Sequence, residues 1–198
     1  MGVGVNRWTR PPFPCHCWHM SEQNSMIPFT KASFTVLEES TVLEALRSGR
    51  LEGDGPATKK VHQFFESKYG FLKTLFTTSC TDALELAALL LDIQPGDEVI
   101  VPAFTYVATA EVIGLLGLTP VMVDVDKDTF NITPAIVENA ITSKTKLIVP
   151  VHLFGQCADM EKILKIATDA NSYVIEDNAQ SIGADYTCLD GSTHKSGT

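Results

Sequence analysis

Short apolar runs alternate with helix-forming segments between residues 72 and 176, and this alternation constrains the fold more than any other feature of the sequence. The runs are continuously apolar, which is typical of strands buried on both faces of a parallel sheet. Segments long enough for crossover helices separate them. The sequence therefore predicts an α/β fold with a mostly parallel sheet that helices cover on both faces.

The expected elements can be placed by residue range. We expect strands at residues 72–77, 98–101, 121–125, 147–151 and 173–176. We expect helices at residues 79–92, 105–116, from Thr133 onward, and from an Asp159 cap to about Ala170. Pro134 after Thr133 suits a helix start. Two further helices, at residues 35–48 and 56–69, form a lead-in that ends at Gly70.

The helix expected at residues 79–92 contains an apolar run from Ala83 to Leu91 that only Glu85 interrupts. A helix without a polar face must be buried on all sides, so we expect it at the centre of the domain. Ser79 can cap its start and Asp82 can return the bond in a capping box. The free amides of the first turn can bind an anion. Capping alone is the simpler explanation of Ser79 and Asp82, because capping boxes are common.

Composition excludes several classes of function. The net charge is −9 and no block of lysine or arginine is present, which argues against nucleic acid or an anionic membrane as the main partner and favours a small substrate. No apolar run approaches the roughly 20 residues of a membrane span. The cysteines are odd in number and scattered, which suits a reducing cytoplasm: Cys15, Cys17, Cys80, Cys157 and Cys188.

Residues 1–25 differ from the rest of the chain, because prolines and arginines lead into Cys15-His16-Cys17-Trp18-His19 without any periodicity. We expect this extension to be disordered. Its potential metal ligands are crowded into one short run, and no second pair closes a tetrahedral site. Organised sequence begins at Met26, so Met20 and Met26 are alternative starts, and residues 26–198 form the expected domain.

Polar and aromatic side chains follow the expected strands at their carboxyl ends, where parallel sheets bind ligands. We expect these residues to converge: Ser79, Cys80, Thr81, Phe104, Thr105, Tyr106, His152, Asp177, Asn178 and Gln180. They offer a helix N-terminus for a phosphate, a ring for a flat ligand and a carboxylate for a cationic ring nitrogen. Pyridoxal phosphate requires these three features. Asp177 suits the third, although a helix N-cap would explain it equally well.

The sequence resembles the DegT-type sugar aminotransferases, which are fold type I pyridoxal-phosphate enzymes that act on nucleotide-linked keto sugars. The resemblance runs from Met26 to Thr198. Its matching motifs are Gly53-Asp54-Gly55, Thr78-Ser79-Cys80-Thr81-Asp82-Ala83-Leu84, Pro95-Gly96-Asp97-Glu98-Val99-Ile100, Thr105-Tyr106-Val107-Ala108-Thr109, Pro150-Val151-His152-Leu153-Phe154-Gly155, and Glu176-Asp177-Asn178-Ala179-Gln180 with Gly183-Ala184. Six motifs in the family's order make the resemblance specific.

The resemblance implies a role for each matching residue. Ser79, Cys80 and Thr81 would bind the cofactor phosphate. Tyr106 would stack on the pyridine ring, Asp177 would pair with its nitrogen, and Gln180 would bond its 3-oxygen. His152 would line the same cleft, or else be a satisfied polar residue at a strand end. The family further implies a nucleotide-sugar substrate, glutamate as the usual amino donor, and a homodimer.

The family's Schiff-base lysine has no counterpart here. That lysine follows the Asp-containing strand in a Ser- and Phe-rich segment ending in Lys-Asn, whereas the only lysine after Asp177 is Lys195, in residues 191–197 that we expect to form a polar loop. We therefore expect a truncated large domain without a catalytic residue. The alternative to an aminotransferase is a non-catalytic fragment that binds at most the cofactor or a full-length partner. A Rossmann dehydrogenase is disfavoured because no G-x-G-x-x-G follows the first strand.

Overall fold

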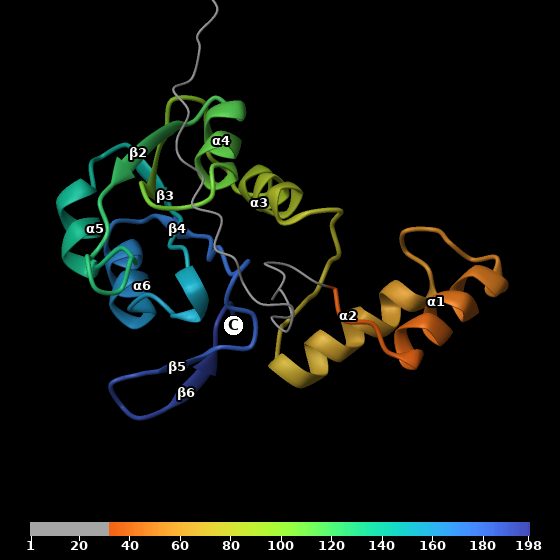
Figure 1. Ribbon diagram of the computed structural model, residues 1–198. Helices are drawn as coiled ribbons and strands as arrows, with labels where there is room; N and C mark the ends of the chain where they lie inside the picture. The colour runs from red at the N-terminus through yellow and green to blue at the C-terminus, as the bar shows by residue number, and fades with distance from the viewer. Residues whose placement is uncertain (1–31) are drawn as a thin grey trace, which may run out of the picture. The chain divides into compact units, whose positions relative to one another are not determined.

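The computed structural model describes residues 32–198, which divide into two units, one ending at Ser48 and the other running from Gly49 to Thr198 (Figure 1). The first unit contains helix α1 (Val36–Ser48), as predicted. The Glu38 carboxylate accepts a hydrogen bond from the Thr35 amide at 2.7 Å and so caps the start of this helix. The expected disorder of residues 1–25 and the question of Met20 or Met26 lie outside the described residues.

The second unit begins with helix α2 (Pro56–Tyr69), which starts at a proline and ends at Gly70 in the left-handed conformation, with φ of 76°. Both boundaries agree with the prediction. The strand predicted at residues 72–77 is wrong. Its backbone does not join the sheet, because the amides of Thr74 and Phe76 donate instead to the side chains of Glu66 and His62 on α2, each at 3.1 Å.

The sheet contains four parallel strands in the order β2-β1-β3-β4. They are β1 (Glu98–Pro102), β2 (Thr119–Val123), β3 (Thr145–Ile148) and β4 (Tyr173–Val174). Pairing continues beyond the last two strands: the Asp177 amide donates to the Pro150 carbonyl at 2.9 Å, and Val151 forms a parallel bridge with Asp177. The parallel sheet predicted from the apolar runs is therefore confirmed.

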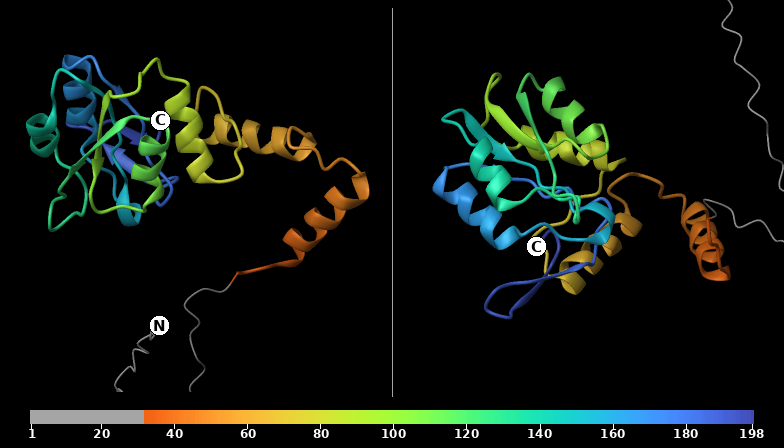
Figure 2. Two further views of the ribbon diagram at one scale, coloured as in Figure 1. Left: turned by 90° about the horizontal axis from the view of Figure 1, so that it is seen from above. Right: turned by 60° about the vertical axis from the view of Figure 1, so that its left-hand side comes forward.

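Helices cover both faces of this sheet, and Figures 1 and 2 show the two layers. Helices α3 (Cys80–Leu89) and α4 (Ala108–Leu115) lie on one side, and α5 (Pro134–Ala140) and α6 (Met160–Asp169) on the other. Side chains alternate between the two cores: Val99 and Leu147 pack with Ile113 of α4, whereas Ile100 and Ile148 pack with Ile163 of α6. The predicted fold class is thus observed.

Helix starts follow the predicted signals to different degrees. Thr133 caps α5 by accepting a hydrogen bond from the Ile136 amide at 3.3 Å, as its position before a proline predicts. Helix α4 begins at Ala108 rather than Thr105. Asp159 occupies the N-cap position of α6 without capping it, because its carboxylate instead accepts from Lys162 at 2.7 Å and from the Tyr186 hydroxyl at 3.0 Å.

The predicted burial of α3 on all sides is wrong. Ala88 is its only buried residue, whereas Leu86, Leu89 and Leu90 are 50%, 58% and 80% exposed. Within residues 49–198, α3 contacts α4, and the residues just after it, Leu91 and Ile93, pack against the sheet. An apolar sequence predicts that a helix will pack against other elements, but it does not specify which elements those are.

The segment after the sheet forms a hairpin that the sequence analysis missed. Strands β5 (Asp185–Thr187) and β6 (Thr193–Lys195) pair antiparallel, so residues 193–195 of the predicted polar loop are a strand. The side chain of Lys195 forms a salt bridge with Asp185 at 2.6 Å and donates to the Gly183 carbonyl at 3.2 Å. These contacts order a segment whose composition alone is typical of a loop.

Two leucines test the placement of the core. Leu147 on β3 is fully buried and Leu90 after α3 is 80% exposed. We expect Leu147→Ala to lower the free energy of unfolding by about 2–5 kcal/mol, because it leaves a cavity between packed layers, and Leu90→Ala to change it by less than about 0.5 kcal/mol. Urea unfolding followed by circular dichroism measures both. Equal losses in the two variants would contradict the assigned core.

Candidate functional site

Asp177 follows β4 and is almost completely buried, with 5% of its surface exposed. The Thr109 hydroxyl, from α4, donates to its Oδ2 atom at 2.9 Å. The Cys80 thiol, at the first residue of α3, lies 3.9 Å from its Oδ1 atom, which also accepts from the Ala179 amide at 3.2 Å. Segments far apart in the sequence therefore meet at this carboxylate.

The partners of the Asp177 carboxylate are all neutral. No salt bridge in residues 32–198 involves Asp177, although an ionised carboxylate is costly to bury without a cation. Each partner donates a hydrogen bond, which fixes the direction of both oxygens. A cationic group of a ligand would complete this arrangement, and the site therefore fits a protonated ring nitrogen.

The start of α3, beside Asp177, has free backbone amides of the kind that can bind an anion. Ser79 caps the helix, since its Oγ accepts from the Asp82 amide at 3.1 Å, as predicted. Asp82 does not complete the capping box, because its carboxylate accepts from the Thr78 hydroxyl. No hydrogen bond in the described part of the chain satisfies the amides of Cys80 and Thr81, which occupy the first turn. These amides fit a phosphate.

The Cys80 thiol is held in its protonated form. Partial burial raises its pKa above the ordinary value, and the negative charge of Asp177 and the hydrogen bond to it raise it further. The thiol therefore serves as a weak donor to the carboxylate near neutral pH. The sequence predicts that Cys80 and Asp177 converge at the strand ends, but it does not predict this direct contact between the thiol and the carboxylate.

Tyr106 lies in the loop between β1 and α4, at the same end of the sheet. Its side chain is 73% exposed, and its ring makes no aromatic or hydrogen-bonded contact within residues 32–198. The neighbouring Thr105 hydroxyl lies 3.1 Å from the Thr109 hydroxyl, which in turn donates to Asp177. These hydrogen bonds connect the loop to Asp177, while the exposed Tyr106 ring remains accessible to a ligand.

Gln180 is oriented by a backbone contact. The amide of Phe154, in the short helix η1 (Leu153–Gly155), donates to the Oε1 atom of Gln180 at 2.8 Å. Because the carbonyl oxygen of this side chain is engaged, its amide nitrogen is left as a donor, and no described residue accepts from it. Such a donor fits an anionic ring oxygen.

The ring of His152 is not part of this cluster. It is fully buried, with its Nδ1 accepting from the Ala158 amide at 3.2 Å, so its Nε2 carries the hydrogen and donates to Glu176 at 2.7 Å. Glu176 and Asp177 are consecutive in an extended segment and point to opposite sides. Of the two predicted interpretations, a satisfied polar residue fits this geometry.

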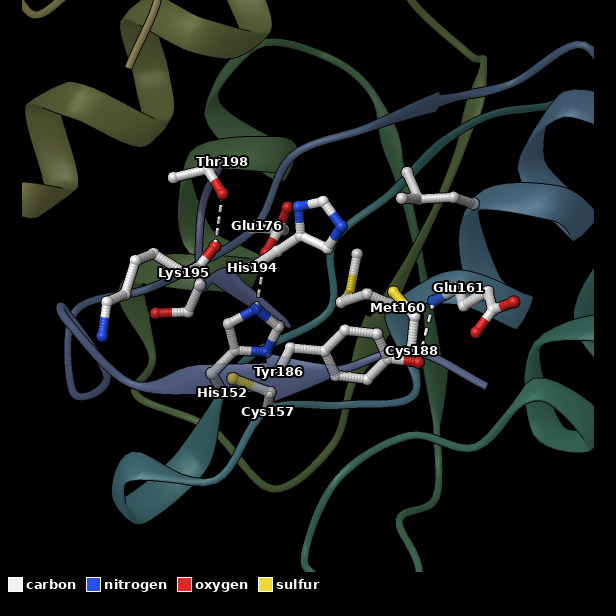
Figure 3. A pocket seen from close by; sticks show the side chains of 12 residues that line it. His152, Cys157, Met160, Glu161, Glu176, Tyr186, Cys188, His194, Lys195 and Thr198 are labelled. Carbon is white, nitrogen blue, oxygen red and sulfur yellow. Dashed lines mark hydrogen bonds and ion pairs between the residues drawn. The ribbon is translucent and has the colours of Figure 1, made fainter. Parts of the chain in front are cut away.

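His152 and Glu176 instead line a cavity of about 300 Å³ between α6 and the β5–β6 hairpin (Figure 3). Cys157, Tyr186 and Lys195 also line it, whereas Asp177, Cys80 and Gln180 do not. The residues predicted to converge therefore do not all share one site. Those around Asp177 meet at the carboxyl ends of the strands, and His152 faces the other side.

Thr109 is the residue of this cluster that the sequence analysis did not single out, although it ends the motif Thr105-Tyr106-Val107-Ala108-Thr109. In the helix predicted at residues 105–116, its spacing of four residues from Thr105 places the two hydroxyls on one face, although the observed α4 begins only at Ala108. The two hydroxyls do meet, at 3.1 Å, and of these two threonines only Thr109 also donates to the Asp177 carboxylate.

These features define an α/β protein whose candidate site lies at the carboxyl ends of its parallel strands. The chain belongs to the DegT/DnrJ/EryC1/StrS aminotransferase family, whose sequence profile matches residues 34–197. Membership makes it a relative of transaminases. None of the helices within residues 32–198 is long and apolar enough to span a membrane.

Named relatives agree with this membership. The chain is 52% identical over 119 residues to UDP-2-acetamido-2-deoxy-3-oxo-D-glucuronate aminotransferase of Pseudomonas aeruginosa, and the match covers 59% of this chain and 33% of that protein. The aminotransferase of Psychrobacter cryohalolentis superimposes with a TM-score of 0.76 at 38% identity over 81% of this chain and 41% of that one. NtdA of Bacillus subtilis with bound cofactor PMP superimposes with a TM-score of 0.70 at 38% identity, and the match covers 73% of this chain and 33% of that one. The chain therefore spans well under half the length of these relatives.

The contact between Cys80 and Asp177 gives a test by thiol reactivity. In Asp177→Asn the carboxylate charge is lost, so the pKa of Cys80 falls and its alkylation by iodoacetamide reaches half-maximal rate at lower pH. Peptide mapping follows Cys80 and Cys157 in the same sample. The pKa of Cys157 is raised mainly by burial and then by Glu176 and Asp185, so its profile serves as the unchanged control. An unshifted Cys80 profile would refute the contact.

Proposed function

We propose that this chain provides the cofactor-binding part of a pyridoxal-phosphate-dependent aminotransferase that acts on a nucleotide-linked keto sugar. The observation that carries the proposal is the buried Asp177 carboxylate, which has only neutral donors and lies 3.9 Å from the thiol of the first residue of α3. Membership of the aminotransferase family and the PMP-bound relative support the choice of cofactor.

Each proposed contact uses a group that the geometry leaves available. The amides of Cys80 and Thr81, with the hydroxyls of Ser79 and Thr81, would hold the phosphate. Asp177 would hold a proton on the ring nitrogen, because its carboxylate stabilises the cationic form.

The remaining contacts orient the ring. Tyr106 would stack on one face, and the amide nitrogen of Gln180 would donate to the 3-oxygen. When bound in this way, the cofactor supplies an electron sink for the substrate C–H bond that breaks.

The substrate class rests on the relatives. The Pseudomonas aeruginosa protein is named for a UDP-linked 3-oxo sugar acid, and we propose a nucleotide-linked keto sugar here. We propose glutamate as the amino donor because the family resemblance implies it. We further propose that the complete enzyme is a homodimer, as the resemblance implies. Free thiols at Cys80, Cys157 and Cys188 support a cytoplasmic location, where thiols stay reduced.

A second proposal, for the 198-residue chain by itself, is that it binds the cofactor without covalent capture and does not transaminate. The contacts of Lys195 favour it, because the ammonium group is engaged by Asp185 at 2.6 Å and by the Gly183 carbonyl at 3.2 Å. Lys195 lines the cavity of His152 and not the cluster around Asp177. A nucleophilic lysine must be freed of its proton and held against the aldehyde carbon.

The proton on the ring nitrogen tests the role of Asp177. With cofactor labelled with ¹⁵N in its ring, we expect the nitrogen resonance of the bound form to be that of a protonated pyridine in the wild-type chain, and that of a neutral pyridine in Asp177→Asn. The variant should still bind the cofactor, since the phosphate contacts remain. Asp54→Asn, whose side chain is 79% exposed on the surface, is the matched control. A protonated nitrogen in Asp177→Asn would refute the assignment.

Borohydride reduction tests the role of Lys195. After incubation with pyridoxal phosphate, reduction and peptide mapping, we expect no more label on Lys195 than on Lys165, which is 77% exposed and paired with Asp169. Lys195→Arg should bind the cofactor as the wild type does. Stoichiometric label on Lys195, with an absorption band that survives dialysis, would overturn the proposal of non-covalent binding.

A further inference from the structure

Three phenylalanines from three separate loops meet on the surface at the carboxyl ends of the strands. Phe104 follows β1, Phe130 lies in the loop after β2, and Phe154 lies in η1 after β3. The ring centroids of Phe104 and Phe130 are 5.5 Å apart, and those of Phe130 and Phe154 are 6.1 Å apart. The three side chains remain 49%, 41% and 69% exposed, so they form a cluster open to solvent.

The backbone at two of these residues is held in an unfavourable conformation. Phe130 has φ of 59° and Phe154 has φ of 55°, a region that bulky side chains rarely adopt. Such strain persists only where the surroundings enforce it, and it is concentrated at ligand-binding sites. Here the Phe130 amide donates to the Asp126 carbonyl at 2.8 Å, and the Phe154 amide donates to Gln180 at 2.8 Å.

Asn131 locks the two strained loops together. Its side chain is buried, with 3% of the residue exposed. Its Nδ2 donates to the Gln156 carbonyl at 2.9 Å, and its Oδ1 accepts from the Leu153 amide at 3.2 Å. The rings of Phe130 and Phe154 are therefore positioned in advance, which lowers the entropic cost of binding a rigid ligand.

The cluster adjoins the proposed cofactor site on two sides. Phe154 is linked through its amide to Gln180, the residue assigned to the 3-oxygen of the cofactor. Phe104 precedes Thr105, whose hydroxyl contacts Thr109 beside Asp177. A substrate that reacts at the cofactor would have these rings within reach of its non-reacting part.

We propose that Phe104, Phe130 and Phe154 form a stacking surface for the base of the nucleotide carried by the sugar substrate. This inference rests on the proposed function and names the part of the substrate that the cluster contacts. The planes of Phe130 and Phe154 meet at 78°, so a flat ring lying on one meets the edge of the other. The cluster offers ring faces and no charge, which suits an aromatic base better than a phosphate or a hydroxylated sugar.

Nucleotide binding tests the cluster directly. We expect uridine 5′-monophosphate to show saturation transfer to its base protons in NMR of the 198-residue chain, and ribose 5-phosphate, which lacks the base, to bind at least about fivefold more weakly. Phe104→Leu, which has no strained backbone to disturb, and Phe154→Leu should each weaken uridine monophosphate binding by about fivefold or more. Phe64→Leu, at a 48% exposed phenylalanine on α2, should leave it unchanged.

Pyridoxal phosphate binding, measured on the same samples, separates this inference from the proposed function. Variants that keep the cofactor and lose the nucleotide support the stacking surface. Unchanged nucleotide binding in both cluster variants, or equal binding of ribose 5-phosphate, overturns it and leaves the cofactor assignment intact. A wild-type chain that binds the nucleotide but not the cofactor refutes the proposed function alone. Altered sedimentation of the cluster variants without altered nucleotide binding would instead identify a contact between copies and overturn the inference.

Discussion

The parallel backbone pairing between residues 149–151 and 175–177 is the constraint on which the site depends. The Asp177 amide donates to the Pro150 carbonyl at 2.9 Å, and the His152 amide donates to the Asp177 carbonyl at 3.1 Å, so the pairing continues past the ends of β3 and β4. Extended backbone sends consecutive side chains to opposite sides. This pairing therefore directs Asp177 toward Thr109 and Cys80, and directs Glu176 toward the buried ring of His152.

The sequence predicts the sheet well because continuous apolar strands have few alternatives to burial between helices. It also predicts the ends of α2 and the cap of α5, which depend on single local residues such as Gly70 and Thr133. The two wrong predictions concern the strand expected at residues 72–77 and the burial of α3. Residues 72–77 have the composition of a strand, but their amides donate to side chains of α2. The apolar α3 has exposed leucines. Both outcomes depend on which neighbouring element pairs or packs with the segment, and the local sequence does not determine that.

The sequence predicts the part of the candidate site that depends on where the strands end. The rule that ligands bind at the carboxyl ends of parallel strands predicts that Cys80 and Asp177 converge, and the spacing of Thr109 from Thr105 in the predicted helix indicates that these two hydroxyls meet. Contacts that depend on loop conformation were not predictable. The Phe154 amide contacts Gln180 from a loop in which Phe154 has a positive φ, and the side toward which His152 points depends on the register of the strand end. The 119-residue match covers 33% of the Pseudomonas aeruginosa relative, and the proposals for substrate and partner reach beyond the part of the enzyme that this chain represents.

The central claim is that Asp177 and the start of α3 hold opposite ends of one ligand. A crystal structure of this chain soaked with pyridoxal phosphate tests it most directly. The account predicts the phosphate against the amides of Cys80 and Thr81, with the ring nitrogen within hydrogen-bonding distance of Asp177 and the 3-oxygen facing Gln180. A cofactor found instead in the cavity beside His152 and Glu176, or a phosphate remote from α3, would contradict it.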